Sequence, residues 1–166
     1  FDVETRFMIA GEYMKSRTND NLIKVLKRTK FKTGEQVEIV TTDGLMGYPA
    51  VLRKTFSLQS PYHASSRTKS KIIHNVVIAS ERGFNHPIER LHNTIRERTK
   101  VMRGFHGSIN SANAILKGYE IYYNFITKNQ AIKCCPYELA IPELKEELKD
   151  VKNRWLVLIK LATQNI

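Results

Sequence analysis

Two short runs rich in β-branched residues separate the helical patterns of this chain, and that order limits the folds open to it. QVEIVTTDG (36–44) alternates apolar and polar residues and then breaks at Asp43-Gly44. KIIHNVVIA (71–79) is a second run of the same kind. Because β-branched residues and alternation are typical of strands, we predict a strand in each run. Asp43 is then expected where the first strand runs into a loop.

The other patterned segments repeat apolar residues at helical spacing. Thr18 is the predicted N-cap of the first helix and Gly34 its predicted end, while Pro49 suits the first turn of the second helix. We expect helices over five segments: 18–30, 48–56, 86–103, 108–126 and 141–162. The last segment predicts a single long amphipathic helix at the C-terminal side of the chain.

RFMIAGEYMKSR (6–17) is rich in apolar residues and has Gly11 in its middle, which predicts extended chain with two short strands bent at the glycine. The expected order is therefore strands, helix, strand, helix, strand and then several helices. That order favours an α/β fold in which helices flank a mixed sheet.

The charge and composition of the chain limit which classes of binding partner are expected. The chain has 27 Lys and Arg residues against 16 Asp and Glu residues, a net charge of +11 and a pI near 9.7. This balance indicates a polyanionic partner, most often nucleic acid, although an ordinary basic protein is the plainer alternative. No run reaches the roughly 20 apolar residues of a membrane span. Adjacent Cys134 and Cys135 favour a reducing interior, so we expect a cytoplasmic protein without a membrane partner.

One acid stands out in the basic segment NHPIERLHNTIRERTKVMRG (85–104). As a helix, this segment buries a stripe of apolar residues: Ile88, Leu91, Ile95 and Met102. Glu89 shares a neighbouring stripe with three cations: Arg96, Lys100 and Arg103. A solvated charged face, with Glu89 favoured by the helix dipole, is one interpretation. A carboxylate that helps to hold a metal ion beside a phosphate is the other.

Three motifs, FDVETRF, TTDGLMGY and NHPIERLHNTIRERTKVMRGF…YYNFI, resemble the core of prokaryotic insertion-sequence transposases of the DDE type. This family shares the RNase H-like fold of retroviral integrases. The resemblance covers roughly residues 1–141 and implies a catalytic core there, followed by a helical extension over 142–166. It also implies that the first strand is truncated and that the chain is a fragment lacking its N-terminal part.

The resemblance assigns Asp2, Asp43 and Glu89 as the three catalytic and metal-binding acids, at intervals of 41 and 46 residue numbers. Two unit charges about 4 Å apart repel by roughly 4 kcal/mol at an effective dielectric constant near 20, so three carboxylates gather only with compensation. Hard oxygen ligands suit Mg²⁺ or Mn²⁺, and two such ions support phosphodiester hydrolysis. The implied reaction is hydrolysis at an element end and attack of the freed 3′-hydroxyl on target DNA.

Cations near these acids are the expected DNA-binding residues. They are Arg96, Lys100 and Arg103 on the helix, and Lys69 and Lys71 beside a basic loop as weaker candidates. His92 lies three residues after Glu89, where a surface or hydrogen-bonded histidine is the plainer interpretation. The resemblance also implies a homo-oligomer and a nucleoid-associated location in a prokaryotic cell.

The match departs from the family in one place after YYNFI. Relatives continue with R-P-H, whereas this chain reads Thr127-Lys128-Asn129. Two alternatives to an active transposase therefore stay open: a catalytically inactive, nucleic-acid-binding remnant, and an RNase H-like nuclease.

Overall fold

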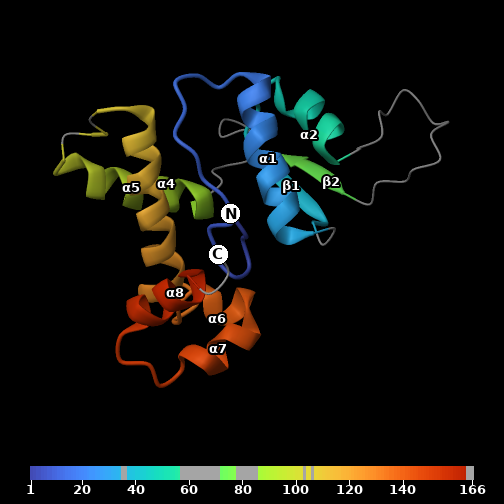
Figure 1. Ribbon diagram of the computed structural model, residues 1–166. Helices are drawn as coiled ribbons and strands as arrows, with labels where there is room; N and C mark the ends of the chain where they lie inside the picture. Colours follow the sequence, from blue (N-terminus) through green and yellow to red (C-terminus); the bar gives the residue numbers. More distant parts are fainter. Residues whose placement is uncertain (35–36, 57–71, 78–85, 103, 106, 164–166) are drawn as a thin grey trace. The chain divides into compact units, whose positions relative to one another are not determined.

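The computed structural model describes residues 1–34, 37–56, 72–77, 86–102, 104–105 and 107–163, which form two compact units (Figure 1). One unit is Glu12–Ala112; we call it the basic unit because it carries 18 Lys and Arg residues against 8 Asp and Glu residues. The other combines Phe1–Gly11 with Asn113–Ile166 and is called the helical unit. The protein belongs to the mixed α/β class, with mainly helical elements and a small parallel sheet.

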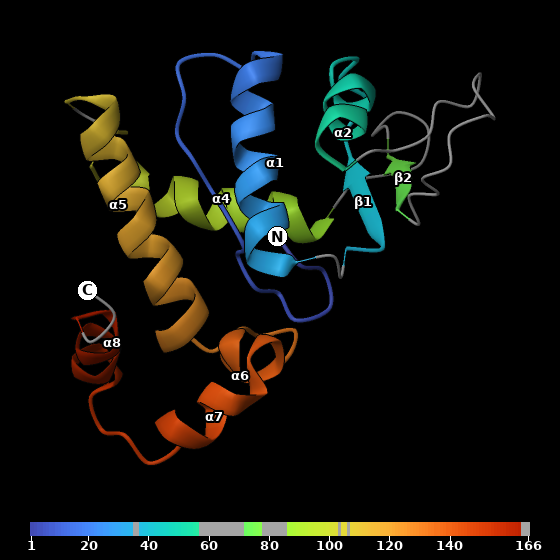
Figure 2. The same cartoon turned by 45° about the vertical axis from the view of Figure 1, so that its right-hand side comes forward.

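The sheet lies in the basic unit and pairs β1 (Ile39–Thr42) with β2 (Ile73–Val76) in parallel. The register runs from Ile39 opposite Ile73 to Thr42 opposite Val76. Both strands predicted from the β-branched runs are thus confirmed. Parallel strands need a crossover connection, and the chain between them carries α2 (Tyr48–Phe56), which Figure 2 shows beside β1. The parallel arrangement brings the carboxyl ends of both strands to the same edge.

Two helices build the core of the basic unit. In α1 (Asn19–Thr33), the Thr18 side chain accepts a hydrogen bond from the Asn21 amide at 3.4 Å, and Gly34 ends the helix with a φ of 61°. Both predicted boundary residues are therefore confirmed. Helix α2 packs against α1 and buries a row of its own side chains: Val51, Leu52, Thr55 and Phe56.

The basic helix α4 (His86–Lys100) buries Leu91 and half-buries Ile88 and Ile95, as predicted. Met102 was expected in the same stripe, but its side chain is 44% exposed because the helix ends at Lys100. Beyond that point the Gly104 amide bonds back to the Thr99 carbonyl at 2.8 Å, and Gly104 has a φ of 94°. A glycine in this conformation turns the chain away from the helix axis, so Met102 leaves the buried side.

The helical unit contains α5 (Ile109–Ile121), whose first residues belong to the basic unit, and a π-helical turn, η1 (Tyr122–Ile126). The predicted helix over 108–126 is thus confirmed. Three further helices follow: α6 (Tyr137–Ala140), α7 (Pro142–Leu148) and α8 (Arg154–Thr163). Their common core consists of fully buried Cys135, Tyr137 and Leu148. None of the described helices is long and apolar enough to cross a membrane.

The single long helix predicted over 141–162 is wrong, because α7 and α8 are separated at residues 149–153. The Asn153 side chain accepts a hydrogen bond from the Leu156 amide at 3.4 Å. An asparagine that satisfies a free amide at a helix start favours a new helix over continuation of the old one. Leu148 closes the first helix by packing into the core of the unit.

The predicted strands over 6–17 are also absent from this described stretch of chain. Arg6 adopts a positive φ of 62°, which interrupts any extended run. The Met8 amide and carbonyl then bond to the side chain of Asn124, at 2.8 and 3.0 Å, instead of to a neighbouring strand. Because the amide group of Asn124 satisfies both backbone groups, no strand partner is needed there.

Candidate functional site

Asp43 directly follows the carboxyl end of β1, as the sequence predicted. One carboxylate oxygen, Oδ1, accepts a hydrogen bond from the Leu45 amide at 3.3 Å. The other, Oδ2, lies 3.3 Å from Nη2 of Arg17. The Asp43 side chain is 56% exposed, so the carboxylate is held in place yet open to solvent.

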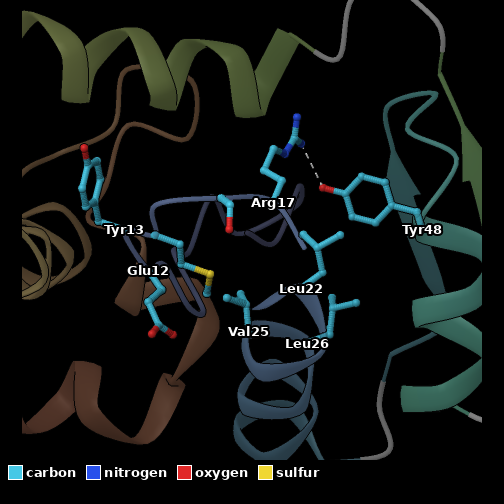
Figure 3. A pocket seen from close by; sticks show the side chains of 9 residues that line it. Glu12, Tyr13, Arg17, Leu22, Val25, Leu26 and Tyr48 are labelled. Carbon is cyan, nitrogen blue, oxygen red and sulfur yellow. Dashed lines mark hydrogen bonds between the residues drawn. The ribbon is translucent and has the colours of Figure 1, made fainter. Parts of the chain in front are cut away.

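Arg17 is a site residue that sequence reasoning missed. It precedes α1, and its Nη2 also donates to the Tyr48 hydroxyl at 3.2 Å, a contact visible in Figure 3. The hydrogen bond that Arg17 donates to Tyr48 contributes most to raising the pKa of the Arg17 guanidinium, and the charge of Asp43 raises that pKa further. No local pattern marks this arginine, because its partners lie 26 and 31 residues further along the chain.

Glu89 occupies the first turn of α4, as predicted, and its side chain is half-buried. It makes no hydrogen bond or ion pair with another described residue. Its charge acts on His92, one helical turn away, where it opposes a lowering of the imidazole pKa. The Glu89 carboxylate is therefore without a hydrogen bond or ion pair to any other described residue.

His92 links the surroundings of Glu89 to those of Asp43. Partial loss of hydration lowers the pKa of this imidazole, and the charges of Arg96 and Arg17 lower it further. Arg17 is the residue that pairs with Asp43, and Figure 3 shows its guanidinium directed toward the olive-green helix α4. The imidazole of His92 is thus influenced by Glu89 and by Arg17, the cationic partner of Asp43.

A second histidine, His74 on β2, was also missed. Its Nε2 lies 2.8 Å from the Thr42 hydroxyl, which also donates to the Asp43 carbonyl at 3.0 Å. Partial burial lowers the pKa of His74. Hydrogen bonds of the Thr42 hydroxyl therefore connect the imidazole of His74 to the backbone carbonyl of Asp43.

Asp2 lies in the helical unit, in a turn rather than on a strand. Its Oδ2 accepts hydrogen bonds from the Thr5 amide, at 3.1 Å, and from the Thr5 hydroxyl. Within the described residues there is no group of three or more His, Cys, Asp and Glu side chains placed to hold a metal ion. The three-acid set of Asp2, Asp43 and Glu89 therefore stays a prediction.

The donor chemistry of Asp43 and Glu89 nevertheless suits a divalent cation. Both offer hard carboxylate oxygens of the kind that Mg²⁺ and Mn²⁺ prefer. Asp43 already holds a cationic partner in Arg17, and Glu89 lies within the field of positive groups on α4. Each carboxylate on its own is thus a suitable ligand for a small, hard cation, and Arg17 competes for that of Asp43.

Two of the predicted DNA-binding cations, Arg96 and Lys100, lie on α4 with exposed side chains. Arg96 donates to the Asn93 side chain at 3.0 Å, which leaves most of its guanidinium open to solvent. The other three, Arg103, Lys69 and Lys71, lie outside the described residues. The described part of α4 therefore carries at least two of these cations with exposed side chains.

A pocket of about 350 Å³ lies beside Arg17 in the basic unit (Figure 3). Apolar side chains of α1 form its floor: Leu22, Val25 and Leu26. The other lining residues are Tyr48, Arg17 and four residues that precede it: Glu12, Tyr13, Met14 and Ser16. Glu12 is itself paired with Arg28 at 3.5 Å. The candidate site thus combines charged side chains with an apolar floor.

Comparison of the chain with protein-family models, with curated proteins and with solved structures finds no match.

Proposed function

We propose that the chain is the catalytic core of a DDE-type DNA transposase with an RNase H-like fold, acting by metal-dependent phosphodiester hydrolysis and 3′-hydroxyl strand transfer. The observation that carries this proposal is the joint placement of two acids in the basic unit. Asp43 follows β1 of a parallel pair, and Glu89 opens the basic helix α4. Asp43 pairs with Arg17, and both Arg17 and Glu89 influence the pKa of His92.

Asp43 and Glu89, with Asp2 as the third acid, are the proposed ligands of two Mg²⁺ or Mn²⁺ ions. Bound ions of this kind stabilise the negative charge that develops on the attacking and leaving oxygens. Asp43 at the end of β1 and Glu89 at the start of α4 would hold these ions. No serine or cysteine nucleophile is needed, because water attacks in the first step.

DNA is the proposed partner because of where the positive charge lies. The basic unit has a net charge of +10 and the helical unit +1, from 18 against 8 and 9 against 8 charged residues. Glu89 lies in the first turn of α4, and Arg96 and Lys100 follow it further along the same helix. Cations in such a row neutralise backbone phosphates and position the duplex without reading its sequence. A homo-oligomer acting in the prokaryotic cytoplasm completes the proposal.

Glu89→Gln tests the catalytic role directly. We expect the variant to bind labelled element-end DNA as well as wild type does, and to lose Mn²⁺-dependent strand cleavage. Glu97→Gln, on the same helix but without a proposed role, is the matched control and should cleave normally. Equal cleavage by the Glu89 and Glu97 variants would remove Glu89 from the site.

A second candidate function is supported by the Arg17–Asp43 contact. In this pair an arginine occupies the place that a metal ion would take at Asp43, so a remnant that only binds nucleic acid is consistent with it. The same cleavage assay separates the two candidates. Wild-type protein that binds DNA but never nicks it with Mn²⁺ would favour the binding remnant.

A further inference from the structure

We propose that Arg17 is an exchangeable counter-ion that couples divalent-cation binding to nucleic-acid binding. In the free chain it neutralises Asp43. A cation that binds Asp43 releases the guanidinium, which then binds a phosphate of the nucleic acid. The inference rests on the proposed function in one respect only, namely that Asp43 is a cation ligand.

The contacts of Arg17 are those of a pair that exchanges easily. A single nitrogen, Nη2, serves both Asp43 Oδ2 and the Tyr48 hydroxyl, at 3.3 and 3.2 Å. The side chains of Arg17 and Asp43 are 62% and 56% exposed. Exposed pairs with one contact between them contribute little net stability, because water screens the charges and both side chains lose freedom. A divalent cation therefore displaces Arg17 at small cost.

The surroundings favour a phosphate as the next partner of Arg17. Its guanidinium is directed toward α4, the helix with exposed Arg96 and Lys100 (Figure 3). Arg17 and Arg96 both lower the pKa of His92, so their positive fields overlap at one place. A released guanidinium adds to that field, and its planar set of donors matches phosphate oxygens. The Tyr48 hydroxyl provides a second polar contact from α2.

Thermodynamic linkage between cation binding and DNA binding makes the role of Arg17 measurable. If a cation frees Arg17 for DNA, the cation raises DNA affinity, and DNA raises cation affinity by the same factor. Removing Arg17 removes the competitor at Asp43 and the extra phosphate contact together. Arg17→Gln should then bind Mn²⁺ about threefold to fivefold more tightly without DNA, the range expected for loss of an exposed ion pair. It should also lose the cation-dependent gain in DNA affinity.

The experiment uses the full chain and no catalytic readout. Mn²⁺ affinity is measured from the electron paramagnetic resonance signal of the free ion. DNA affinity is measured by fluorescence anisotropy of a labelled duplex with and without Ca²⁺, at constant ionic strength. Lys15→Gln is the matched control, since it removes an exposed cation two residues away. Tyr48→Phe loosens Arg17 without removing its charge and should give an intermediate change, while circular dichroism checks that each variant folds.

The outcomes separate this inference from the proposed function. Asp43→Asn should weaken Mn²⁺ binding; if it does not, Asp43 is no cation ligand and both proposals fail. If Asp43→Asn weakens Mn²⁺ binding but Arg17→Gln matches Lys15→Gln in both measurements, only the role of Arg17 is overturned. Tighter Mn²⁺ binding by Arg17→Gln, together with a lost Ca²⁺ effect on DNA affinity, supports it.

Discussion

The two units contain equal numbers of acidic residues but different numbers of basic residues. Each contains 8 Asp and Glu residues, but the basic unit has 18 Lys and Arg residues and the helical unit has 9. All five histidines also fall within the basic unit. The helical unit instead closes on an apolar core around Tyr137 and Leu148. The surplus charge is therefore concentrated where the candidate site lies, and the other unit contributes packing.

The largest expected effect concerns packing in the helical unit. Leu148 is fully buried, so Leu148→Ala should lower the free energy of unfolding by about 2–5 kcal/mol, as large-to-small core changes do. Thermal and denaturant unfolding measure this change. Under conditions where the variant stays folded, its DNA binding should keep the salt dependence of wild type. A changed salt slope would show that the helical unit takes part in binding.

The polar centre of the helical unit should be almost as sensitive. Asn124→Ala removes both hydrogen bonds to the Met8 backbone and leaves that amide and carbonyl buried without partners. We expect a loss of about 2–4 kcal/mol in the free energy of unfolding, roughly 1–2 for each group. Amide hydrogen exchange at Met8 should accelerate with it. Asn129→Ala, which removes a half-buried asparagine of the same unit, is the control and should cost less.

Charge removal should affect the basic unit alone. Arg96→Ala should reduce the slope of log K for DNA against log salt concentration by about 0.9, the value for one lost phosphate contact on duplex DNA. Lys160→Ala removes an exposed cation from α8 of the helical unit and should leave the slope unchanged. Anisotropy titrations over a range of salt concentrations measure both. Equal slopes for the two variants would contradict a phosphate contact at Arg96.

The smallest expected effect is a pH dependence that belongs to the basic unit. Burial and nearby arginines lower the pKa of His92 in the folded chain, so the unfolded chain takes up a proton first as pH falls. Stability contributed by the neutral imidazole is then complete above about pH 6.5 and declines below it. His92→Gln should flatten the melting temperature between pH 7 and 5. An imidazole midpoint at or above 6.5 by NMR would contradict the assigned direction.

Sequence patterns predicted most of the elements because each pattern is local. The Thr18 cap, the Gly34 stop and the Pro49 start act on backbone groups within one turn, and alternation marked both strands. The prediction for 141–162 failed because Asn153 starts a new helix within that segment, and the prediction for 6–17 failed because a distant side chain decided the backbone. Asn124 replaced a strand partner at Met8, 116 residues away in sequence.

By itself, the sequence determined most of the helices, both strands of the sheet and the surplus of positive charge. It also placed Asp43 at the end of β1 and Glu89 at the start of α4. Only the tertiary structure decided that Arg17 meets Asp43 and Tyr48, and that His74 meets Thr42. The physical reason is distance along the chain. Periodicity records which side of an element is buried, whereas an ion pair between segments 26 residues apart depends on how those segments pack.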